Sequence, residues 1–224
     1  SDNKDASAAY DYLSNLSDVD KNNISLIGHS FGGPQSLKLA ETKKIHKIVM
    51  LTSTVLPTDK LMLEQNEIIM KLQKVADDEI KKYLEELKIQ LSAIKNKTLK
   101  CKEPSCSMID GVEVLDKSIQ VPWLHEVLNQ NFLDLTNKQP SSVLFIFGNS
   151  DFVIPKSEQN LVTERLVAKS PQKFKISVIE KLDHFMVENE TKEESLKYVM
   201  KAKKEKAFKN ISSELIAKIT DWLK

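Results

Sequence analysis

The chain has 224 residues, of which 41% are hydrophobic and 29% charged, so it can bury one sizeable hydrophobic core. Thirty-three basic residues nearly balance 32 acidic ones and leave a net charge of +1, so no global field attracts nucleic acid or an anionic membrane. We therefore expect no nucleic-acid partner. No apolar run approaches the roughly 20 residues that cross a bilayer. Residues 1–12 are too polar for a signal peptide, so we expect neither a membrane span nor such a signal.

The apolar pattern predicts an α/β fold. Residues 5–17 read as a helix, and four apolar runs that follow predict strands at 24–28, 45–52, 143–148 and 174–179. Helical patterns lie between or after these runs, and a final apolar stripe predicts a helix that packs on the sheet; it comprises Ile211, Leu215, Ile216, Ile219, Trp222 and Leu223. Such alternation is typical of a parallel sheet flanked by helices, in which functional residues follow the carboxyl ends of strands.

The segment 28–33, Gly-His-Ser-Phe-Gly-Gly, stands between the first strand and an amphipathic helix predicted at 31–44. This spacing predicts a nucleophile elbow, a strained turn that exposes the Ser30 hydroxyl above the sheet edge. We expect Gly28 and Gly32 to be needed because a Cβ at either position would crowd neighbouring backbone, and Gly33 to let the helix pack closely on the sheet. The helix would aim its N-terminus at any oxyanion formed there. A serine in an ordinary glycine-flanked turn is the alternative.

Between the second and third strands lies an insertion, residues 57–140, that is far longer than a usual α/β connection. We expect a mostly helical subdomain there, with residues 1–56 and 141–224 forming the core. Its first part predicts one long amphipathic helix, or a pair broken near Asp77, which packs as a cap or forms a dimer or partner seam. Cys101 and Cys106 could close a small disulfide loop or remain thiols, and they lack the further ligands of a zinc site.

A serine nucleophile needs a base and a carboxylate that orients the base. Asp151 follows the third predicted strand and His184 follows the fourth, so both are expected at the same sheet edge as Ser30. The chain order Ser30, Asp151, His184 is the order of one hydrolase architecture. The other three histidines, His29, His46 and His125, are poorer candidates for the base. His29 points away from the serine, and His46 sits inside a strand.

The segments 28–33, 148–155 and 183–185 resemble the three signature blocks of the α/β-hydrolase superfamily, above all serine-aminopeptidase-like and acylglycerol-lipase-like esterases. The resemblance covers about residues 5–56 and 140–224, with the insertion in the place of the variable cap. It implies attack by Ser30 on a small-molecule acyl substrate, proton transfer by His184, orientation by Asp151 and no cofactor. It also implies an oxyanion donor in the backbone N–H of Phe31. Trp123 could line the acyl pocket or simply belong to the hydrophobic core.

The chain departs from this family pattern in its lead-in. In the family about a hundred residues with four strands precede the elbow, whereas 29 residues precede Ser30 here. We therefore expect a fragment, a cleaved product or partner of another chain, or a degenerate hydrolase, with the N-terminal half of the same protein as a partner. We expect this segment alone to be poorly active and prone to aggregate.

Three functions stay open at this point. The triad favours a serine hydrolase of carboxylic esters or related acyl substrates. A peptidase or thioesterase would use the same scaffold, and the cap rather than the triad would distinguish it. A catalytically silent interaction module that uses the helices of the insertion is the third.

Overall fold

The computed structural model describes residues 2–96, 122–205 and 209–224. The chain forms two compact units, one from Ser1–Val55 and Phe132–Lys224, the other from Leu56–Asn131. No helix among the described residues is long and apolar enough to cross a membrane.

The larger unit is built on a parallel sheet of four strands in the order β1-β2-β3-β4. The strands are β1 (Leu26–His29), β2 (Lys47–Leu51), β3 (Ser142–Gly148) and β4 (Phe174–Ile179). The four predicted strands are thereby confirmed to within a few residues, and the fold class is confirmed as a mostly parallel sheet flanked by helices. The carboxyl ends of β1, β2 and β3 come into register where His29 pairs with Leu51 and Leu51 with Ile146, so the segments that follow them meet at one edge.

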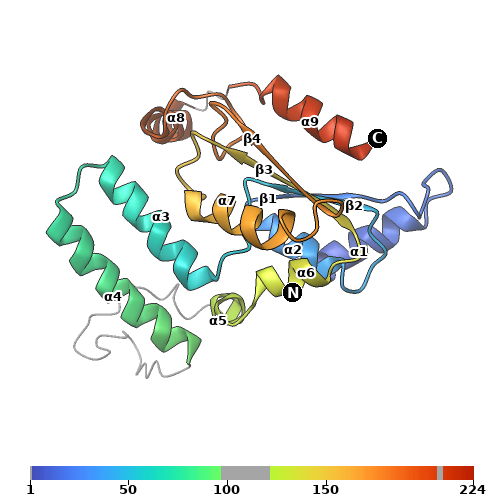
Figure 1. Cartoon of the computed structure of the whole chain (residues 1–224), viewed down its shortest axis with the longest axis horizontal. Coiled ribbons are helices and arrows are strands. Elements are labelled where there is room, and N and C mark those ends of the chain that lie inside the picture. The colour runs from blue at the N-terminus through green and yellow to red at the C-terminus, as the bar shows by residue number, and fades with distance from the viewer. Residues whose placement is uncertain (1, 97–121, 206–208) are drawn as a thin grey trace. The chain divides into compact units, whose positions relative to one another are not determined.

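Helices cover both faces of this sheet, because alternate side chains of a strand point to opposite faces. On one face, Val49, Leu51, Leu144 and Ile146 form a buried cluster with Leu215 of α9 (Ser213–Leu223). The other face carries α2 (Gly32–Leu39), and Figure 1 shows α7 (Lys156–Val162) on that side as well. A short π-helical turn, Thr163–Val167, continues α7.

The final helix packs on the sheet as predicted, but not with all of its apolar residues. Ile219, Trp222 and Leu223 lie against the buried cluster with Leu215. Ile211 and Ile216 are 52% and 55% exposed, so their predicted place in the packed stripe is wrong. Ile216 follows Leu215 directly and therefore points about 100° around the helix from it.

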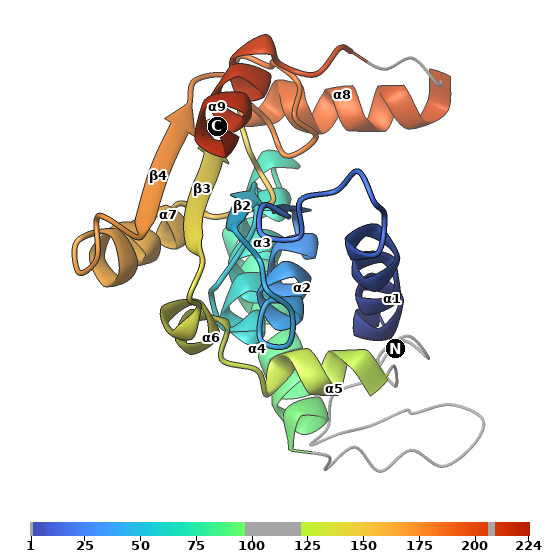
Figure 2. The same ribbon diagram turned by 90° about the vertical axis from the view of Figure 1, so that its right-hand side faces the viewer.

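The first helix, α1 (Asp2–Ser14), packs alongside α2, as Figure 2 shows at the right of the view. The Lys43 ammonium group contacts the Asp11 carboxylate at 2.6 Å, and the Tyr10 hydroxyl donates to the Lys44 carbonyl oxygen at 2.9 Å. These bonds join α1 to the end of the segment that follows α2. The charged segment before α9 forms α8 (Lys192–Glu205).

In the described part of the smaller unit, residues 56–96 and 122–131, the helices are α3 (Thr58–Leu72), α4 (Asp77–Lys95) and α5 (Pro122–Leu128). Of the two alternatives for this segment, the helix pair broken near Asp77 is confirmed, because α3 ends at Leu72 and α4 begins at Asp77; the single long helix is wrong. Within the unit, the Thr58 hydroxyl donates to the Val127 carbonyl oxygen at 3.0 Å, and Lys95 pairs with Asp59 at 3.0 Å.

Helix α6 (Phe132–Lys138) belongs to the larger unit, although we placed residues 57–140 together in the insertion. The Phe132 and Phe31 rings pack in a T-shaped arrangement with 5.8 Å between centroids. The Gln139 amide donates to the Leu37 carbonyl oxygen at 3.0 Å. These contacts with α2 and the turn before it move the boundary from residue 140 to residue 131.

Candidate active site

Ser30 lies in a tight turn between the end of β1 and the start of α2. Its φ of 53° lies in the left-handed region, which a serine seldom occupies without structural support. Two backbone hydrogen bonds provide that support. The Ser30 N–H donates to the Leu51 carbonyl oxygen at 3.0 Å, and the Ser30 carbonyl oxygen accepts from the Gly33 N–H at 3.2 Å. The elbow is thus tied both to β2 and to the first turn of α2.

The glycines around Ser30 differ in how much space a Cβ atom would have at each position. A Cβ on Gly28 would lie 2.4 Å from the Gly32 carbonyl oxygen, and a Cβ on Gly33 would lie 2.0 Å from the Ser53 hydroxyl, so the space argument holds at both positions. A Cβ on Gly32 would meet no atom within 4 Å, so the expected crowding at Gly32 is wrong. Gly32 is the first residue of α2, where its Cβ direction faces open space rather than backbone.

The structure brings the three predicted catalytic side chains together. The His184 Nε2 atom lies 3.0 Å from the Ser30 Oγ atom, and its Nδ1 atom lies 3.1 Å from Asp151 Oδ2. Asp151 is 2% and His184 5% exposed, whereas Ser30 is half-buried. The imidazole therefore bridges a half-buried hydroxyl and a carboxylate held away from water. The catalytic roles of the three residues remain predictions.

Asp151 sits in a loop that its own carboxylate fixes. Oδ1 accepts the backbone N–H groups of Val153 at 2.7 Å and Ile154 at 2.9 Å, which leaves Oδ2 facing the histidine. The loop begins at Gly148, where a Cβ would come within 1.9 Å of the Leu182 carbonyl oxygen. Glycine at this position allows the acid loop and the histidine loop to approach one another.

The histidine loop is organised around Asp183, a fully buried carboxylate. Oδ1 accepts the backbone N–H groups of Phe185 at 2.8 Å and Val187 at 3.1 Å. Oδ2 accepts the Asn189 amide at 2.8 Å and the Ser195 hydroxyl at 2.9 Å. Sequence reasoning gave Asp183 no role, because an aspartate beside a histidine carries no sign of which residues surround it.

The histidine loop follows β4, and Lys181 near its start has a strained backbone conformation. Lys181 has a φ of 58°, and its carbonyl oxygen accepts the Asn189 N–H at 2.8 Å. Its side chain binds Glu190 at 2.7 Å, and this hydrogen bond raises the pKa of the Lys181 ammonium group. The start and end of the loop are thereby closed on each other.

His29 contributes through a contact that the sequence did not reveal. Its Nε2 atom lies 2.7 Å from the His184 carbonyl oxygen, and the two rings are 5.0 Å apart between centroids. The prediction that His29 is a poorer base than His184 agrees with this placement, since its nitrogen is engaged with backbone. His29 instead ties the end of β1 to the histidine loop.

Phe31 caps the N-terminus of α2 directly after the serine, which is the position predicted for the oxyanion donor. Trp123 falls within α5 of the smaller unit, and its side chain lies outside the described part of the structure, as do Cys101 and Cys106. Among the residues that the structure describes, no group of three or more His, Cys, Asp or Glu side chains is placed to hold a metal ion.

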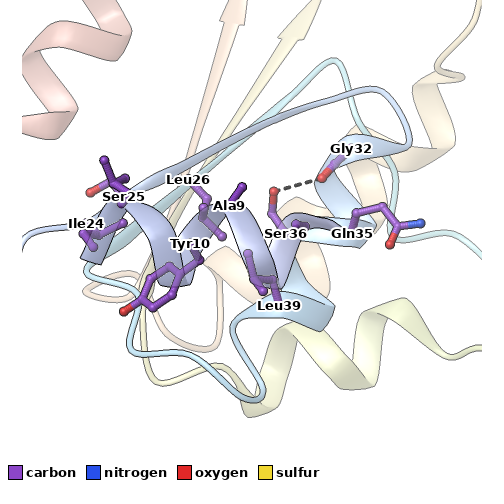
Figure 3. Close-up of a pocket in the computed structure, with 11 residues that line it drawn as sticks. Ala9, Tyr10, Ile24, Ser25, Leu26, Gly32, Gln35, Ser36 and Leu39 are labelled. Atoms are coloured by element: carbon purple, nitrogen blue, oxygen red, sulfur yellow. Dashed lines mark hydrogen bonds between the residues drawn. The ribbon is translucent and has the colours of Figure 1, made fainter. Parts of the chain in front are cut away.

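A separate pocket of about 360 Å³ lies between α1, β1 and α2 and is mostly apolar. Figure 3 shows Tyr10, Leu26 and Leu39 among the side chains that line it, together with the bond of 2.9 Å from the Ser36 hydroxyl to the Gly32 carbonyl oxygen. None of Ser30, Asp151 and His184 lines this pocket, so it is distinct from the predicted catalytic group.

The chain is similar to proteins that are named as an esterase and as an α/β hydrolase. The chain is 24% identical to esterase EstD of Thermotoga maritima over 228 residues, which cover 98% of this chain and 47% of the relative. It therefore spans about half the length of that curated relative. The α/β hydrolase GrgF of Penicillium sp. sh18 superimposes with a TM-score of 0.51 at 14% identity, over 99% of this chain and 70% of GrgF. An esterase of Pyrococcus furiosus matches at 17% identity with a TM-score of 0.46, over 81% of this chain and 52% of its own.

The family comparison covers almost the whole chain. The model of the family described as "Alpha/beta hydrolase of unknown function (DUF1057)" matches residues 2–223. The match spans both units and every segment that carries a predicted catalytic residue. The chain therefore belongs to this family of α/β hydrolases.

Proposed function

We propose that this chain carries the catalytic centre of a serine hydrolase that cleaves a carboxylic ester or a related acyl substrate. The observation that carries the proposal is the His184 ring, whose two nitrogens lie within 3.1 Å of the Ser30 hydroxyl and the Asp151 carboxylate. A base placed between a nucleophile and an orienting acid is the arrangement that activates a serine. The names of the similar proteins point to the same class of reaction.

In the first step, the Ser30 oxygen attacks the acyl carbon while His184 Nε2 takes the hydroxyl proton. Asp151 accepts from Nδ1–H and so keeps the unprotonated nitrogen toward the serine. The tetrahedral intermediate expels the alcohol, which receives the proton from Nε2. Water then attacks the acyl-enzyme with His184 as the base, and the acid leaves as Ser30 regains its proton.

We assign one oxyanion donor to the backbone N–H of Phe31, because this residue directly follows the nucleophile at the start of α2. A donor at a helix N-terminus also benefits from the positive end of the helix dipole. We further propose that residues 56–131 form the cap that selects the acyl or leaving group, with Trp123 as a pocket residue. In this proposal the substrate is a small molecule and no cofactor takes part.

Substrate profiling of the full-length protein tests the proposal. We expect turnover of p-nitrophenyl esters of one range of acyl lengths in preference to acyl thioesters and aminoacyl p-nitroanilides, with loss of turnover in Ser30→Ala. Ser141→Ala is the control, because it also removes one serine hydroxyl, but the Ser141 hydroxyl donates to the Ile45 carbonyl oxygen at the opposite end of the strands. Turnover that survives Ser30→Ala would refute the assignment of Ser30 as the nucleophile. A preference for thioesters or anilides would refute the ester as the substrate class and indicate a thioesterase or a peptidase instead.

A further inference from the structure

Three consecutive hydroxyl residues follow β2 directly: Thr52, Ser53 and Thr54, which we call the hydroxyl tripeptide. They are 0%, 1% and 2% exposed. Buried hydroxyl groups are retained in folded proteins when they have hydrogen-bond partners, so the identity of these partners indicates what the segment holds.

Ser53 binds the nucleophile turn. Its hydroxyl donates to the Ser30 carbonyl oxygen at 2.6 Å, the same oxygen that accepts the Gly33 N–H. The hydroxyl also occupies the space that a Cβ on Gly33 would need, as the separation of 2.0 Å shows. Ser53 is thus fitted between the strained turn and the first turn of α2.

Thr52 binds the histidine loop. Its hydroxyl donates to the His184 carbonyl oxygen at 3.4 Å, and that oxygen also contacts His29 Nε2 at 2.7 Å. Its φ of 40° is unusual for a β-branched residue. Its N–H donates to the Ile146 carbonyl oxygen of β3 at 2.8 Å, so the strained conformation is held from both sides.

Thr54 binds the helix that follows the acid loop. Its hydroxyl donates to Glu158 Oε2 at 2.6 Å, and the next N–H, of Val55, donates to Oε1 at 2.7 Å. Glu158 is fully buried and lies in the first turn of α7, seven residues after Asp151. The carboxylate of Glu158 therefore joins the end of β2 to α7, the helix that follows the acid loop.

We propose that the hydroxyl tripeptide positions all three parts of the catalytic group, with one residue for each segment. The proposal rests on the proposed function. Each bond ends on a backbone carbonyl or on Glu158, not on the reacting hydroxyl, the imidazole or the Asp151 carboxylate, so these are positioning residues. Because a misplacement of about 1 Å can cost roughly 100-fold in rate, such bonds would act on the chemical step more than on substrate binding.

The test compares Ser53→Ala with Ser141→Ala in the full-length protein. Both substitutions remove a buried hydroxyl that donates to a backbone carbonyl oxygen at 2.6 Å, so a purely structural role predicts similar falls in Tm and equal activity. We expect both to lower Tm, but only Ser53→Ala to lower kcat for a p-nitrophenyl ester and the rate of Ser30 labelling by a fluorophosphonate, by about 10-fold or more. KM should stay within about twofold.

A second pair of variants tests the positioning role even if Ser53→Ala does not fold. Thr52→Val keeps the side-chain shape without the hydroxyl, and Thr52→Ser keeps the hydroxyl. We expect the valine variant to be slower in both assays and the serine variant to recover most of the rate. Wild-type rates in Ser53→Ala, or equal rates in Thr52→Val and Thr52→Ser, would overturn the positioning role. A wild-type protein whose Ser30 is not labelled would overturn the proposed function itself.

Discussion

Removal of the Asp183 carboxylate should destabilise the protein far more than removal of an exposed carboxylate. Asp183 is fully buried and accepts four hydrogen bonds, two from backbone N–H groups and two from side chains. Asp183→Ala leaves all four donors without this acceptor. At a net value of about 1 kcal/mol for each bond, the free energy of unfolding should fall by about 4 kcal/mol. That is a large share of the roughly 5–15 kcal/mol that stabilises a typical domain.

Asp183→Asn should fall between the wild type and Asp183→Ala. The remaining amide oxygen can still accept the N–H groups of Phe185 and Val187. The new amide NH₂ group instead faces the Asn189 amide and the Ser195 hydroxyl, which both donate in the wild type. With two bonds disrupted, the expected loss is about 2 kcal/mol.

Urea unfolding followed by tryptophan fluorescence measures these losses, since Trp222 packs against the buried cluster of the sheet. Asp221→Ala serves as the control, because the Asp221 side chain is 76% exposed and should change stability by less than about 0.5 kcal/mol. An Asp183→Ala protein as stable as Asp221→Ala would refute the reasoning that this carboxylate organises the histidine loop.

Three further predictions concern the elbow, the acid and the core. Gly28→Ala should prevent folding, or labelling of Ser30 by a fluorophosphonate, because its Cβ would overlap the Gly32 carbonyl oxygen. Gly32→Ala should instead raise the stability measured by thermal unfolding by up to about 1 kcal/mol. Equal effects of the two substitutions would contradict the difference in space at the two glycines. Asp151→Asn should leave the fold intact, since one oxygen can still accept the loop N–H groups, but lower kcat by about 10³–10⁴-fold through the wrong histidine tautomer; unchanged kcat would refute the orienting role. Leu215→Ala should lose about 2–5 kcal/mol and Ile216→Ala far less in urea unfolding, because Leu215 is 1% and Ile216 55% exposed; similar losses would contradict the packing of α9.

The sequence predicted the strands and the sheet-edge residues because both depend on local patterns. Short apolar runs marked all four strands, and the rule that functional residues follow strand ends placed Ser30, Asp151 and His184 at one edge. The break between α3 and α4 was also visible, since a cluster of acidic residues suits a helix N-terminus.

The contacts that hold the site could not be predicted in this way, because they join segments far apart in the chain. The bonds from Ser53 to Ser30 and from His29 to His184 end on backbone carbonyl groups, which leave no mark on residue type. A run of three hydroxyl residues directly after a buried strand was the available signal for the hydroxyl tripeptide. The error at Gly32 arose because spacing identifies a glycine motif but not the direction of each missing Cβ.

Labelling of the full-length protein with a fluorophosphonate, mapped by peptide mass spectrometry, tests the central claim most directly. The account predicts one adduct, on the Ser30 hydroxyl that lies 3.0 Å from the His184 ring, with loss of labelling in Ser30→Ala and much slower labelling in His184→Ala. Ester hydrolysis by a protein that carries no adduct on Ser30, or labelling as fast in His184→Ala as in the wild type, would contradict it.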